Sequence, residues 1–477
     1  MAFGKANAGA TNVGAKSFDA TPANYTTLGT LIDPTKPDVR DLYIQTFGDQ
    51  GITGLLDVTG AKRSAGTADE VHWYEEGRMN KKIRIDIDNT TNGTLGGKVA
   101  TIDQVDGATA TGSADDHVRP NDVLLADDGL RYIVLGTVAT GALTFDIARL
   151  DQTAISAADT DLVCTVIGNA YGQGTSQPSQ PFEMGLTLRK NPYIIAKETF
   201  HVNGSQATNI GWLNVNGQNM WYLKGEMDAR KRFMNTREAM LVFGEIASSS
   251  GAPSATAGQT TANGKVTGSE GYFQAVENRG IVSSTPGEQA FGAGEINDLD
   301  GILLALDGEG APSEYAMYVN RGTSLAIDDM LAAGITGASN LSAGLSAQFG
   351  AFNNSPDMAV QLGFKSFQRG GYTFHKHDWK LLNDPYQAGH TSYQGALIPL
   401  ANVVDPKSGG SNPSLEMNYK AAGNYSREME HWVEGGGVLG YATNGDDVAK
   451  FHYRSECNLC VRAANQHVVL KGNTYTN

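Results

Sequence analysis

Hydrophobic and polar residues alternate over several short segments of the chain, which is the pattern of strands with one buried face. Ile83, Ile85 and Ile87 alternate with charged residues, and the surrounding run 71–88 predicts a hairpin. The run 182–202 has the same character. The two runs together predict one long hairpin.

The segment 92–176 between these runs has a different composition. It consists of short apolar runs separated by Gly, Asp and Asn, and RPNDVLLADDGLRYIVLGTV reads as strand, Asp-Asp-Gly turn and strand. This pattern predicts a small β-barrel or sandwich inserted into the tip of the long hairpin.

The longest predicted helix lies within residues 214–250. Met220, Met227, Met234 and Leu241 recur every seven residues and predict a stripe that faces the core. Lysine and arginine gather beside this stripe, from Arg230 through Lys231 to Arg232, where they could meet an acidic loop of a neighbouring subunit.

Helix and strand patterns alternate over much of the second half of the chain. The predicted elements are helices at 295–306 and 323–333, a buried strand at 315–319, two strands within 359–379 joined by an Arg-Gly-Gly turn, and strands and turns over 394–477. Thr323 or Ser324 is expected to cap the second helix, and Gly334 is expected to end it.

Composition changes this picture by excluding classes of protein. The net charge is −15, whereas a free-standing nucleic-acid binder carries a basic patch. Three cysteines (Cys164, Cys457 and Cys460) argue against a disulfide framework and for a reducing compartment. The first residues carry no signal-peptide pattern, and no run of 18 apolar residues predicts a membrane span. Residues 1–25 have few large apolar side chains and predict a flexible arm.

Candidate chemistry is sparse. Cys457 and Cys460 form a single C-x-x-C pair that His452 and His467 could complete as a zinc site. The segment alternates like a strand, which points the two thiols to opposite faces, so buried small side chains are the favoured interpretation.

Two further motifs also fail as sites. His375 and His377 share a strand face without a helpful third ligand, and Gly258–Lys265 departs from the phosphate-binding loop in its spacing. We therefore predict no catalytic residue, no cofactor and no metal.

The order of parts is informative: a polar arm, a long hairpin, one long amphipathic helix, a compact α/β unit and closing strands. This order, with EINDLDGILLAL, EYAMYVNRGTSLAIDDMLAAG and FKSFQRGGYTFHKHDWKLLNDP, resembles the major capsid proteins of tailed bacteriophages with the Hong-Kong-97 fold. Within that family, we suspect the crAss-like or podovirus-like branch.

The resemblance implies an α+β fold with named parts. They are an N-terminal arm at 1–60, an extended loop at 61–91 and 177–205 with the inserted β domain at 92–176, a peripheral domain with its spine helix at 206–265 and 400–477, and an axial domain at 266–399.

The resemblance also implies a structural protein and not an enzyme. Such a subunit assembles with itself into hexamers and pentamers of an icosahedral head in the host cytoplasm, with scaffold, portal and decoration proteins as partners. Packaged double-stranded DNA would be touched only weakly, and no membrane is involved.

The expected contact residues lie in the hairpin and on the long helix: Trp73, Tyr74, Arg78, Lys81, Lys82, Arg84, Arg230, Lys231 and Arg232. The alternative is a β-rich phage tail or host-binding module that uses the 92–176 segment as its receptor- or glycan-binding head.

Overall fold

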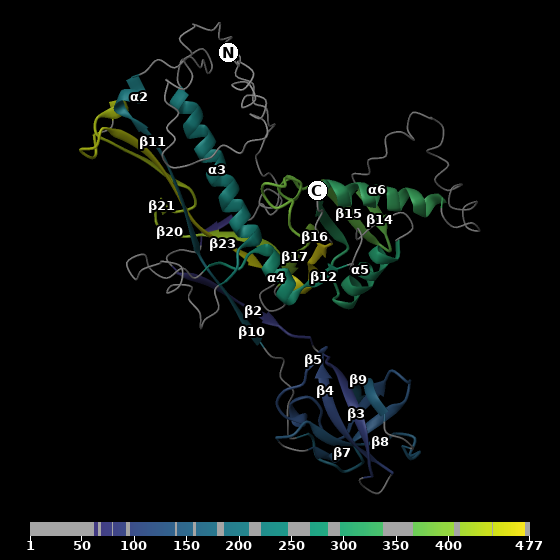
Figure 1. Cartoon of the computed structure of the whole chain (residues 1–477). Coiled ribbons are helices and arrows are strands. Elements are labelled where there is room, and N and C mark those ends of the chain that lie inside the picture. The colour runs from purple at the N-terminus through teal and green to yellow at the C-terminus, as the bar shows by residue number, and fades with distance from the viewer. Residues whose placement is uncertain are drawn as a thin grey trace, which may run out of the picture. The chain divides into compact units, whose positions relative to one another are not determined.

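The computed structural model describes residues 62–64, 68–78, 80–91, 96–138, 141–155, 159–178, 186–208, 221–246, 268–284, 296–336, 366–404, 411–440 and 442–472. The chain divides into two compact units (Figure 1). We call Trp73–Arg189 the inserted unit, and Met1–His72 with Lys190–Asn477 the main unit. The whole predicted arm at 1–60 lies outside the described residues.

The inserted unit is a closed antiparallel sheet. Its six ring strands follow the order β3-β9-β6-β7-β8-β4, and β4 pairs back to β3. The bounds are β3 Lys82–Thr91, β4 Lys98–Val105, β6 Asp122–Ala126, β7 Arg131–Val138, β8 Thr144–Arg149 and β9 Asp159–Asn169, with β5 (Ala108–Thr109) added beside β4. Ile83, Ile85 and Ile87 are each no more than 3% exposed and enter one core with strands from all around the ring. Closure pairs every ring strand on both sides.

The predicted hairpin over 71–88 is wrong. Strand β2 (Glu70–Glu76) instead pairs with β10 (Leu186–Pro192), as the predicted long hairpin between the runs 71–88 and 182–202 requires, and β3 pairs with β4 and β9 in the closed sheet. Alternation along β3 reports one buried face, but it does not identify the partner strand. The run 182–202 also divides, because β11 (Ile194–Asn203) pairs along its whole length with β23 (Val448–Val461) of the main unit.

The main unit contains two large sheets. The first has the order β1-β19-β23-β11, with β22 (Glu430–Gly435) also paired to β23; β1 is Lys62–Ser64 and β19 is Leu415–Tyr419. Helix α3 (Trp221–Phe243) lies along this sheet in Figure 1, and Phe233 packs with Val202, Phe451 and Tyr453 beneath it.

Helix α3 falls within the predicted range, but its buried face differs from the methionine stripe. Met227 is 63% exposed and Met234 is 44% exposed, whereas Ala229, Phe233 and Arg237 are buried. The buried positions are four residues apart, which keeps them on the side of the helix that meets the sheet. Met227 and Met234 were therefore wrongly predicted as core, whereas Leu241 of the same predicted stripe is 1% exposed and lies in a core. Met220 lies outside the described residues.

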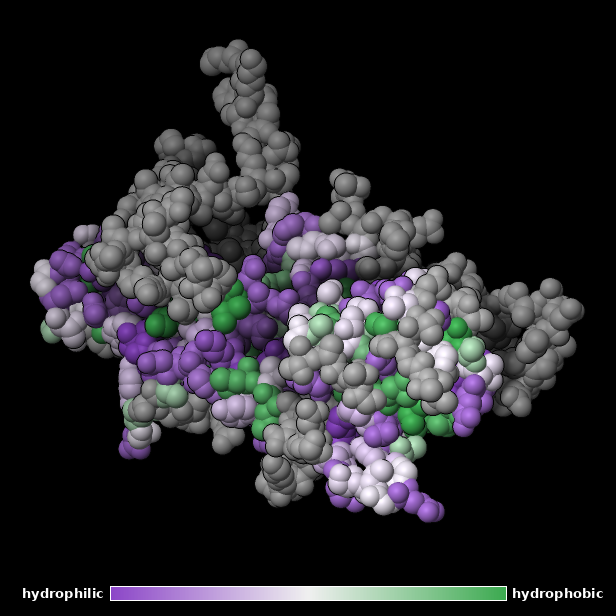
Figure 2. All heavy atoms as spheres, turned by 90° about the horizontal axis from the view of Figure 1, so that it is seen from below, coloured by the Kyte–Doolittle hydropathy of each residue, from purple (hydrophilic) through white to green (hydrophobic). Residues whose placement is uncertain are grey.

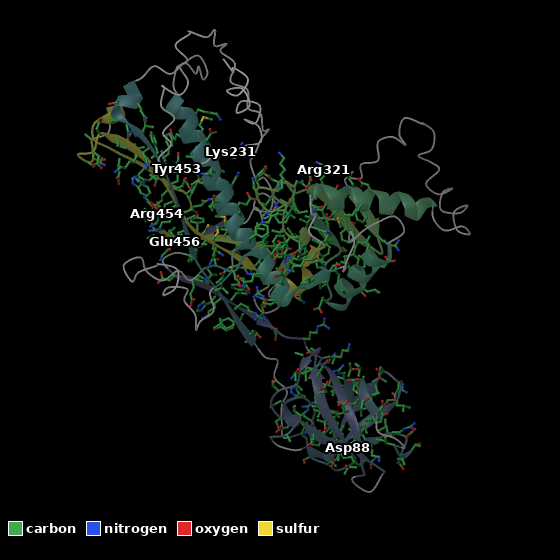
Figure 3. All side chains as sticks on the ribbon, in the orientation of Figure 1. Asp88, Lys231, Arg321, Tyr453, Arg454 and Glu456 are labelled. Carbon is green, nitrogen blue, oxygen red and sulfur yellow. The ribbon has the colours of Figure 1, made fainter. Side chains whose placement is uncertain are left out.

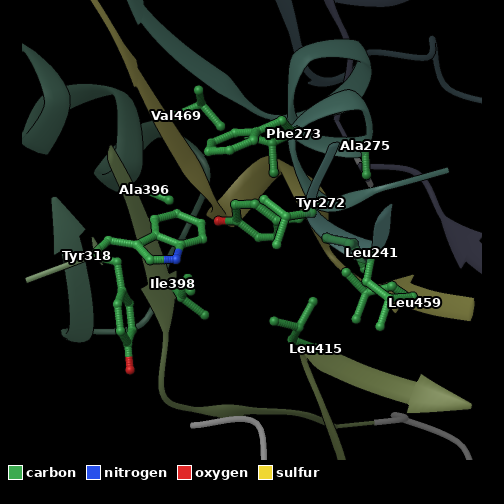
Figure 4. Packing of buried hydrophobic residues seen from close by; sticks show 14 of the residues in the cluster. Leu241, Tyr272, Phe273, Ala275, Tyr318, Ala396, Ile398, Leu415, Leu459 and Val469 are labelled. Atoms are coloured by element: carbon green, nitrogen blue, oxygen red, sulfur yellow. The ribbon is translucent and has the colours of Figure 1, made fainter. Parts of the chain in front are cut away.

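The second sheet is buried on both faces. Its order is β12-β24-β16-β13-β15-β14, with β12 Ile281–Ser284, β13 Glu314–Val319, β14 Ser366–Arg369, β15 Tyr372–Asp378, β16 Tyr393–Pro399 and β24 Val468–Lys471. Tyr315 and Met317 of β13 enter one core, and Ala316 and Tyr318 enter the other. Figure 4 shows part of the core that contains Ala316 and Tyr318. This core continues to Leu415 and Leu459 of the first sheet and so joins the two sheets.

Helices cover this second sheet. Tyr272 and Phe273 of α4 (Tyr272–Arg279) enter the core shared with the first sheet, and α5 (Ile296–Gly308) and α6 (Arg321–Thr336) contribute to the other core. Helix α6 begins before the predicted cap, because Asn320 Oδ1 accepts a hydrogen bond from Thr323 N at 2.7 Å. It also continues to Thr336, two residues past Gly334.

The Arg-Gly-Gly turn between β14 and β15 is confirmed. Gly370 and Gly371 have φ angles of +58° and +87°, the left-handed pair of a tight two-residue hairpin. The remaining short elements are α2 Gly204–Thr208, β17 Asn402–Val404, β18 Ser411–Pro413, β20 Ala421–Ala422 and β21 Tyr425–Ser426.

Two glycines allow the segment before α4 to approach the end of α3. Gly271 N donates to Gly244 O at 2.8 Å, and a Cβ on Gly271 would lie 2.5 Å from Gly244 N. We expect Gly271→Ala to lower the free energy of unfolding of the main unit by about 1–3 kcal/mol, because the obstructing atoms are backbone. Urea denaturation measures the change.

Gly301→Ala is the matched control for this prediction. Gly301 lies in α5 with no atom within 4 Å of an added Cβ. Alanine is the better helix former, so we expect a gain of about 0.5–1 kcal/mol. Equal effects of the two substitutions would contradict the close-approach explanation.

Candidate functional site

Two partly exposed strands form a two-stranded ribbon. We call β2 with β10 the ribbon; the two strands pair only with each other among the described strands. Each therefore presents an open edge within the described part of the chain. An isolated two-stranded ribbon is marginally stable in water, and open edges are sites at which another chain can pair.

One face of the ribbon exposes large apolar side chains among charged ones. Glu75 Oε2 accepts a hydrogen bond from Arg189 Nε at 3.0 Å, so these two side chains share a face. Because strand side chains alternate, Tyr74, Leu186 and Leu188 point to the other face. Their exposed fractions are 68%, 62% and 46%. Large apolar side chains gathered in the open mark a surface that another molecule covers.

The opposite face of the ribbon is polar and internally bonded. Trp73 is 9% exposed, and its indole Nε1 donates to Glu75 Oε1 at 3.0 Å. Glu75 thus joins Trp73 to Arg189 across the two strands. These hydrogen bonds within the chain fix which side chains lie on each face of the ribbon.

At the end of β10, within the main unit, one buried amide joins several segments. Asn191 is fully buried; its Nδ2 donates to the carbonyls of Glu270 at 2.9 Å and Leu459 at 2.7 Å. Its Oδ1 accepts from Glu270 N at 2.8 Å and from Ser269 Oγ at 3.1 Å. All four hydrogen-bonding positions of this side chain are used.

A charged contact supports the start of β2. Lys420 Nζ lies 2.6 Å from Asp69 Oδ1, and the ammonium lowers the pKa of that carboxyl. Asp69 is the residue before β2, and its carbonyl oxygen accepts a hydrogen bond from Tyr193 N. Asp69, Lys420 and Tyr193 all belong to the main unit, so these contacts fix the chain just before β2 and just after β10.

The predicted contact residues fall on three different elements. Trp73 and Tyr74 are in the ribbon, and Arg78 is an exposed residue after β2. Lys81 and Lys82 stand at the start of β3, with Lys81 Nζ donating to the Asp116 carbonyl at 3.1 Å.

Arg84 has a structural role inside the inserted unit. Its Nη2 lies 2.6 Å from Asp103 Oδ2, and its Nε lies 3.3 Å from Asp161 Oδ1. The hydrogen bond with Asp103 raises the pKa of the guanidinium. Arg84 therefore bridges β3 with the strands on either side of it.

The basic cluster on α3 has a mixed environment. Arg232 pairs with Glu198 of β11, Arg230 is exposed, and Lys231 is half-buried. Figure 3 shows Lys231 on α3 and Tyr453 on strand β23 beside it. With Met227 and Met234, these cations give α3 an apolar and basic outer surface.

Sequence reasoning missed Leu186, Leu188 and Asn191. Leu186 and Leu188 alternate with polar neighbours, and that alternation by itself indicates a buried face. Asn191 sits in the short run RKNP, which contains no local signal of a buried amide. Figure 2 shows hydrophobic residues in several separate surface patches on the face it displays.

The cysteines lack the properties of reactive thiols. All three are buried, and desolvation raises the pKa of Cys164 and of Cys460 to about 12. Cys457 belongs to a hydrophobic core, whereas Cys460 Sγ accepts a hydrogen bond from Asn418 on the other side of β23. His467 is hydrogen-bonded to Tyr272, and His452 is hydrogen-bonded to Thr199. The four residues that could have formed a zinc site therefore have separate partners.

The described residues contain neither a cluster of metal ligands nor a helix that could span a membrane. No three His, Cys, Asp or Glu side chains gather there as a metal site would require. None of the described helices combines the length and hydrophobicity needed to cross a membrane.

Comparisons with known proteins gave structural neighbours only. No family model matches the chain, and no curated protein matches it. Among solved structures, the chain is similar to one from the capsid of the cyanophage P-SCSP1u, with 9% identity and a TM-score of 0.39 over 95% of this chain and 100% of that chain.

Two further neighbours illustrate the range. A chain of Microbacterium phage Oxtober96 has 8% identity and a TM-score of 0.38 over 93% of this chain and 97% of that chain. A chain from the capsid of a native GTA particle has 11% identity and a TM-score of 0.34 over 64% and 82%.

Proposed function

We propose that this protein is the major capsid subunit of a tailed bacteriophage and works by self-assembly into hexamers and pentamers of an icosahedral head. The observation that carries the proposal is the ribbon with its uncovered face of Tyr74, Leu186 and Leu188. A surface of this kind is explained by a neighbouring subunit that covers it. A head-to-tail contact of this type closes into rings of five or six.

The layout of the main unit supports the same proposal. Helix α3 with the β11–β23 sheet corresponds to a peripheral domain with its spine helix, and the six-stranded sheet with α5 and α6 corresponds to an axial domain. The ribbon corresponds to the extended loop, and the closed sheet of the inserted unit is an added domain within it. Strand β24 lies in the six-stranded sheet, so we extend the axial domain beyond 266–399 to include it.

A second contact surface is proposed on α3. Met227 and Met234 are exposed beside Arg230 and Lys231, a combination that suits an acidic and partly apolar segment of another subunit. Arg78, Lys81 and Lys82 are retained as contact candidates, whereas Arg84 is assigned to the internal bonding of the inserted unit.

The proposed partners follow from assembly. A scaffold and a portal protein would direct closure of the head, and decoration proteins could bind outside it. The net charge of −15 limits adhesion to packaged DNA, which would touch the shell weakly and without sequence preference. No cofactor is proposed, and the place of action is the virion.

The test is assembly of the full chain and of a ribbon variant. We expect the unaltered protein, expressed with and without a scaffold protein, to yield rings or closed shells in negative-stain electron microscopy. The double substitution Tyr74→Lys with Leu188→Lys should abolish assembly, because it places two charges on the face to be covered. Its melting temperature should stay near that of the unaltered protein, since both side chains are exposed.

Ile167→Lys is the matched control for the ribbon variant. Ile167 lies in β9 and is 55% exposed, but it is not part of the ribbon. We expect it to assemble normally. A stable trimer or monomer under every condition, or equal assembly by the ribbon variant, would contradict the proposal.

A further inference from the structure

The segment that leads into β23, residues 443–447, contains the pair Asn444–Gly445, and we call it the entry loop. Figure 1 shows this end of β23 beside α2, and Gly204 N of α2 donates a hydrogen bond to Asp447 O at 3.1 Å. Asn444 is half-buried and Gly445 is exposed. The amide carbon of an asparagine can be attacked by the next backbone nitrogen, and glycine carries no side chain that would hinder this approach.

The attacking atom of such a reaction, Gly445 N, is available. This nitrogen makes no hydrogen bond within the described part of the chain. A Cβ added to Gly445 would meet no atom within 4 Å, so the space around it is open. The residues on either side are held, because Asn444 N donates to Gly435 O at 3.3 Å and Val448 N donates to Asp446 O at 2.7 Å. The nitrogen is therefore exposed in a loop of defined shape.

The side chain of Asn444 is turned back over its own loop. Its Oδ1 accepts a hydrogen bond from Asp446 N at 3.2 Å. The ring that this bond closes contains both Asn444 Cγ and Gly445 N, so the two atoms that would join lie within one tight turn. A donor to Oδ1 also stabilises the negative charge that develops on this oxygen when Cγ is attacked. Position and charge therefore both favour attack at this amide.

A second Asn-Gly pair among the described residues provides a contrast. Asn203 is the last residue of β11 and pairs with Val448, and Gly204 N is occupied by its hydrogen bond to Asp447 O. A Cβ on Gly204 would collide with the Asp447 carboxylate, so this glycine is closely surrounded. Strand pairing keeps Asn203 extended, and a nitrogen that already donates a hydrogen bond is a poor nucleophile. The fold should therefore protect Asn203.

We propose that Asn444 is a site of spontaneous deamidation through a succinimide. Gly445 N gives up its proton to hydroxide and forms a bond to Asn444 Cγ; the bond from Cγ to Nδ2 then breaks, and ammonia leaves. Water opens the ring. Cleavage at Cγ gives an aspartyl residue, and cleavage at the main-chain carbonyl carbon gives an isoaspartyl linkage. The net reaction consumes water and releases ammonia, and it does not depend on the proposed function.

The product changes both the charge and the backbone of the entry loop. It adds a carboxylate close to Asp446 and Asp447, which are both exposed. An isoaspartyl linkage also adds one methylene to the backbone between Asn444 N and Asp447 O, both of which are hydrogen-bonded. The contact of Asp447 O with α2 is therefore expected to loosen as the protein ages.

The experiment is peptide mapping by mass spectrometry after the full chain has been incubated in mildly alkaline buffer. We expect Asn444 to convert at least tenfold faster than Asn203, with part of the product labelled by an isoaspartyl methyltransferase. Gly445→Ala should slow the conversion of Asn444 at least tenfold, because the new methyl group hinders the attacking nitrogen. The open space around Gly445 should allow this variant to fold.

Gly301→Ala is the matched control, because it also adds a methyl group in open space but lies in α5. It should leave the conversion of Asn444 unchanged, and circular dichroism melting would verify that both variants remain folded. Three results would overturn the proposal: no conversion of Asn444 in the folded chain over a time in which it converts in urea, equal rates at Asn444 and Asn203 in the folded chain, or an unchanged rate in Gly445→Ala.

Discussion

Asn191→Leu is expected to lower the free energy of unfolding of the main unit by about 3–5 kcal/mol. The substitution keeps a branched side chain, although a larger one, and removes every hydrogen bond that the amide makes. The carbonyls of Glu270 and Leu459 and the Glu270 N–H would remain in the buried environment without this partner. Each such group costs about 1–3 kcal/mol, although relaxation recovers part of the sum. Urea denaturation followed by circular dichroism measures the loss.

The inserted unit provides an internal reference for this measurement. It has its own hydrophobic core and closed sheet, so its unfolding transition should not shift. Asn169→Leu is the matched control, since Asn169 is exposed at the end of β9, and we expect a change within about 0.5 kcal/mol. A loss below about 1 kcal/mol for Asn191→Leu would show that the four bonds contribute little.

The position of Asn191 connects stability with the proposed assembly. The amide joins the end of β10 to β23 and to the segment that leads into α4, which enters the core shared by both sheets. Loss of this joint should loosen the base of the ribbon before the rest of the main unit unfolds. Hydrogen exchange in β10 should therefore increase more than exchange in α6 in the same variant.

Local patterns predicted elements better than partners. The alternation of Ile83, Ile85 and Ile87 identified a half-buried strand, and the Arg-Gly-Gly turn identified the β14–β15 hairpin. Both depend on residues close together in sequence. The pairing of β2 with β10 agrees with the predicted long hairpin, but the pairing of β3 with β9 and of β11 with β23 was not predicted, because no local pattern specifies a distant partner strand.

The candidate site was predictable only in part for the same reason. Trp73 and Tyr74 were expected contact residues, but the structure buries Trp73 and exposes Tyr74. The difference follows from the alternation of faces once Glu75 is bonded to Arg189, a contact between distant segments. The seven-residue spacing of Met227 and Met234 predicted a stripe on α3, but only the position of the sheet decides which stripe is buried.

The main unit is also expected to lose stability between pH 7 and pH 5, because of one buried histidine. His467 is 0% exposed, and desolvation lowers its pKa from 6.5 to about 3. Above pH 6.5 the ring is neutral in both the folded and the unfolded chain, so it has no effect. Below pH 6.5 the unfolded chain binds a proton that the folded chain excludes, and stability falls progressively until about pH 3. The expected loss from this residue at pH 5 is about 2 kcal/mol.

The pH dependence can be assigned to His467 by substitution. His467→Gln retains a polar group near the Tyr272 hydroxyl, which lies 3.2 Å from His467 Nδ1, but it removes the titration. Between pH 7 and pH 5, the free energy of unfolding should fall by about 2 kcal/mol less in this variant than in the unaltered protein. This difference does not depend on how stable the variant is at pH 7. His201→Gln is the control, since His201 is exposed on β11, and its pH profile should follow the unaltered protein. Most paired carboxylates titrate below this window, so a profile that stays flat from pH 7 to pH 5, or that flattens equally in both variants, would exclude His467 as the cause.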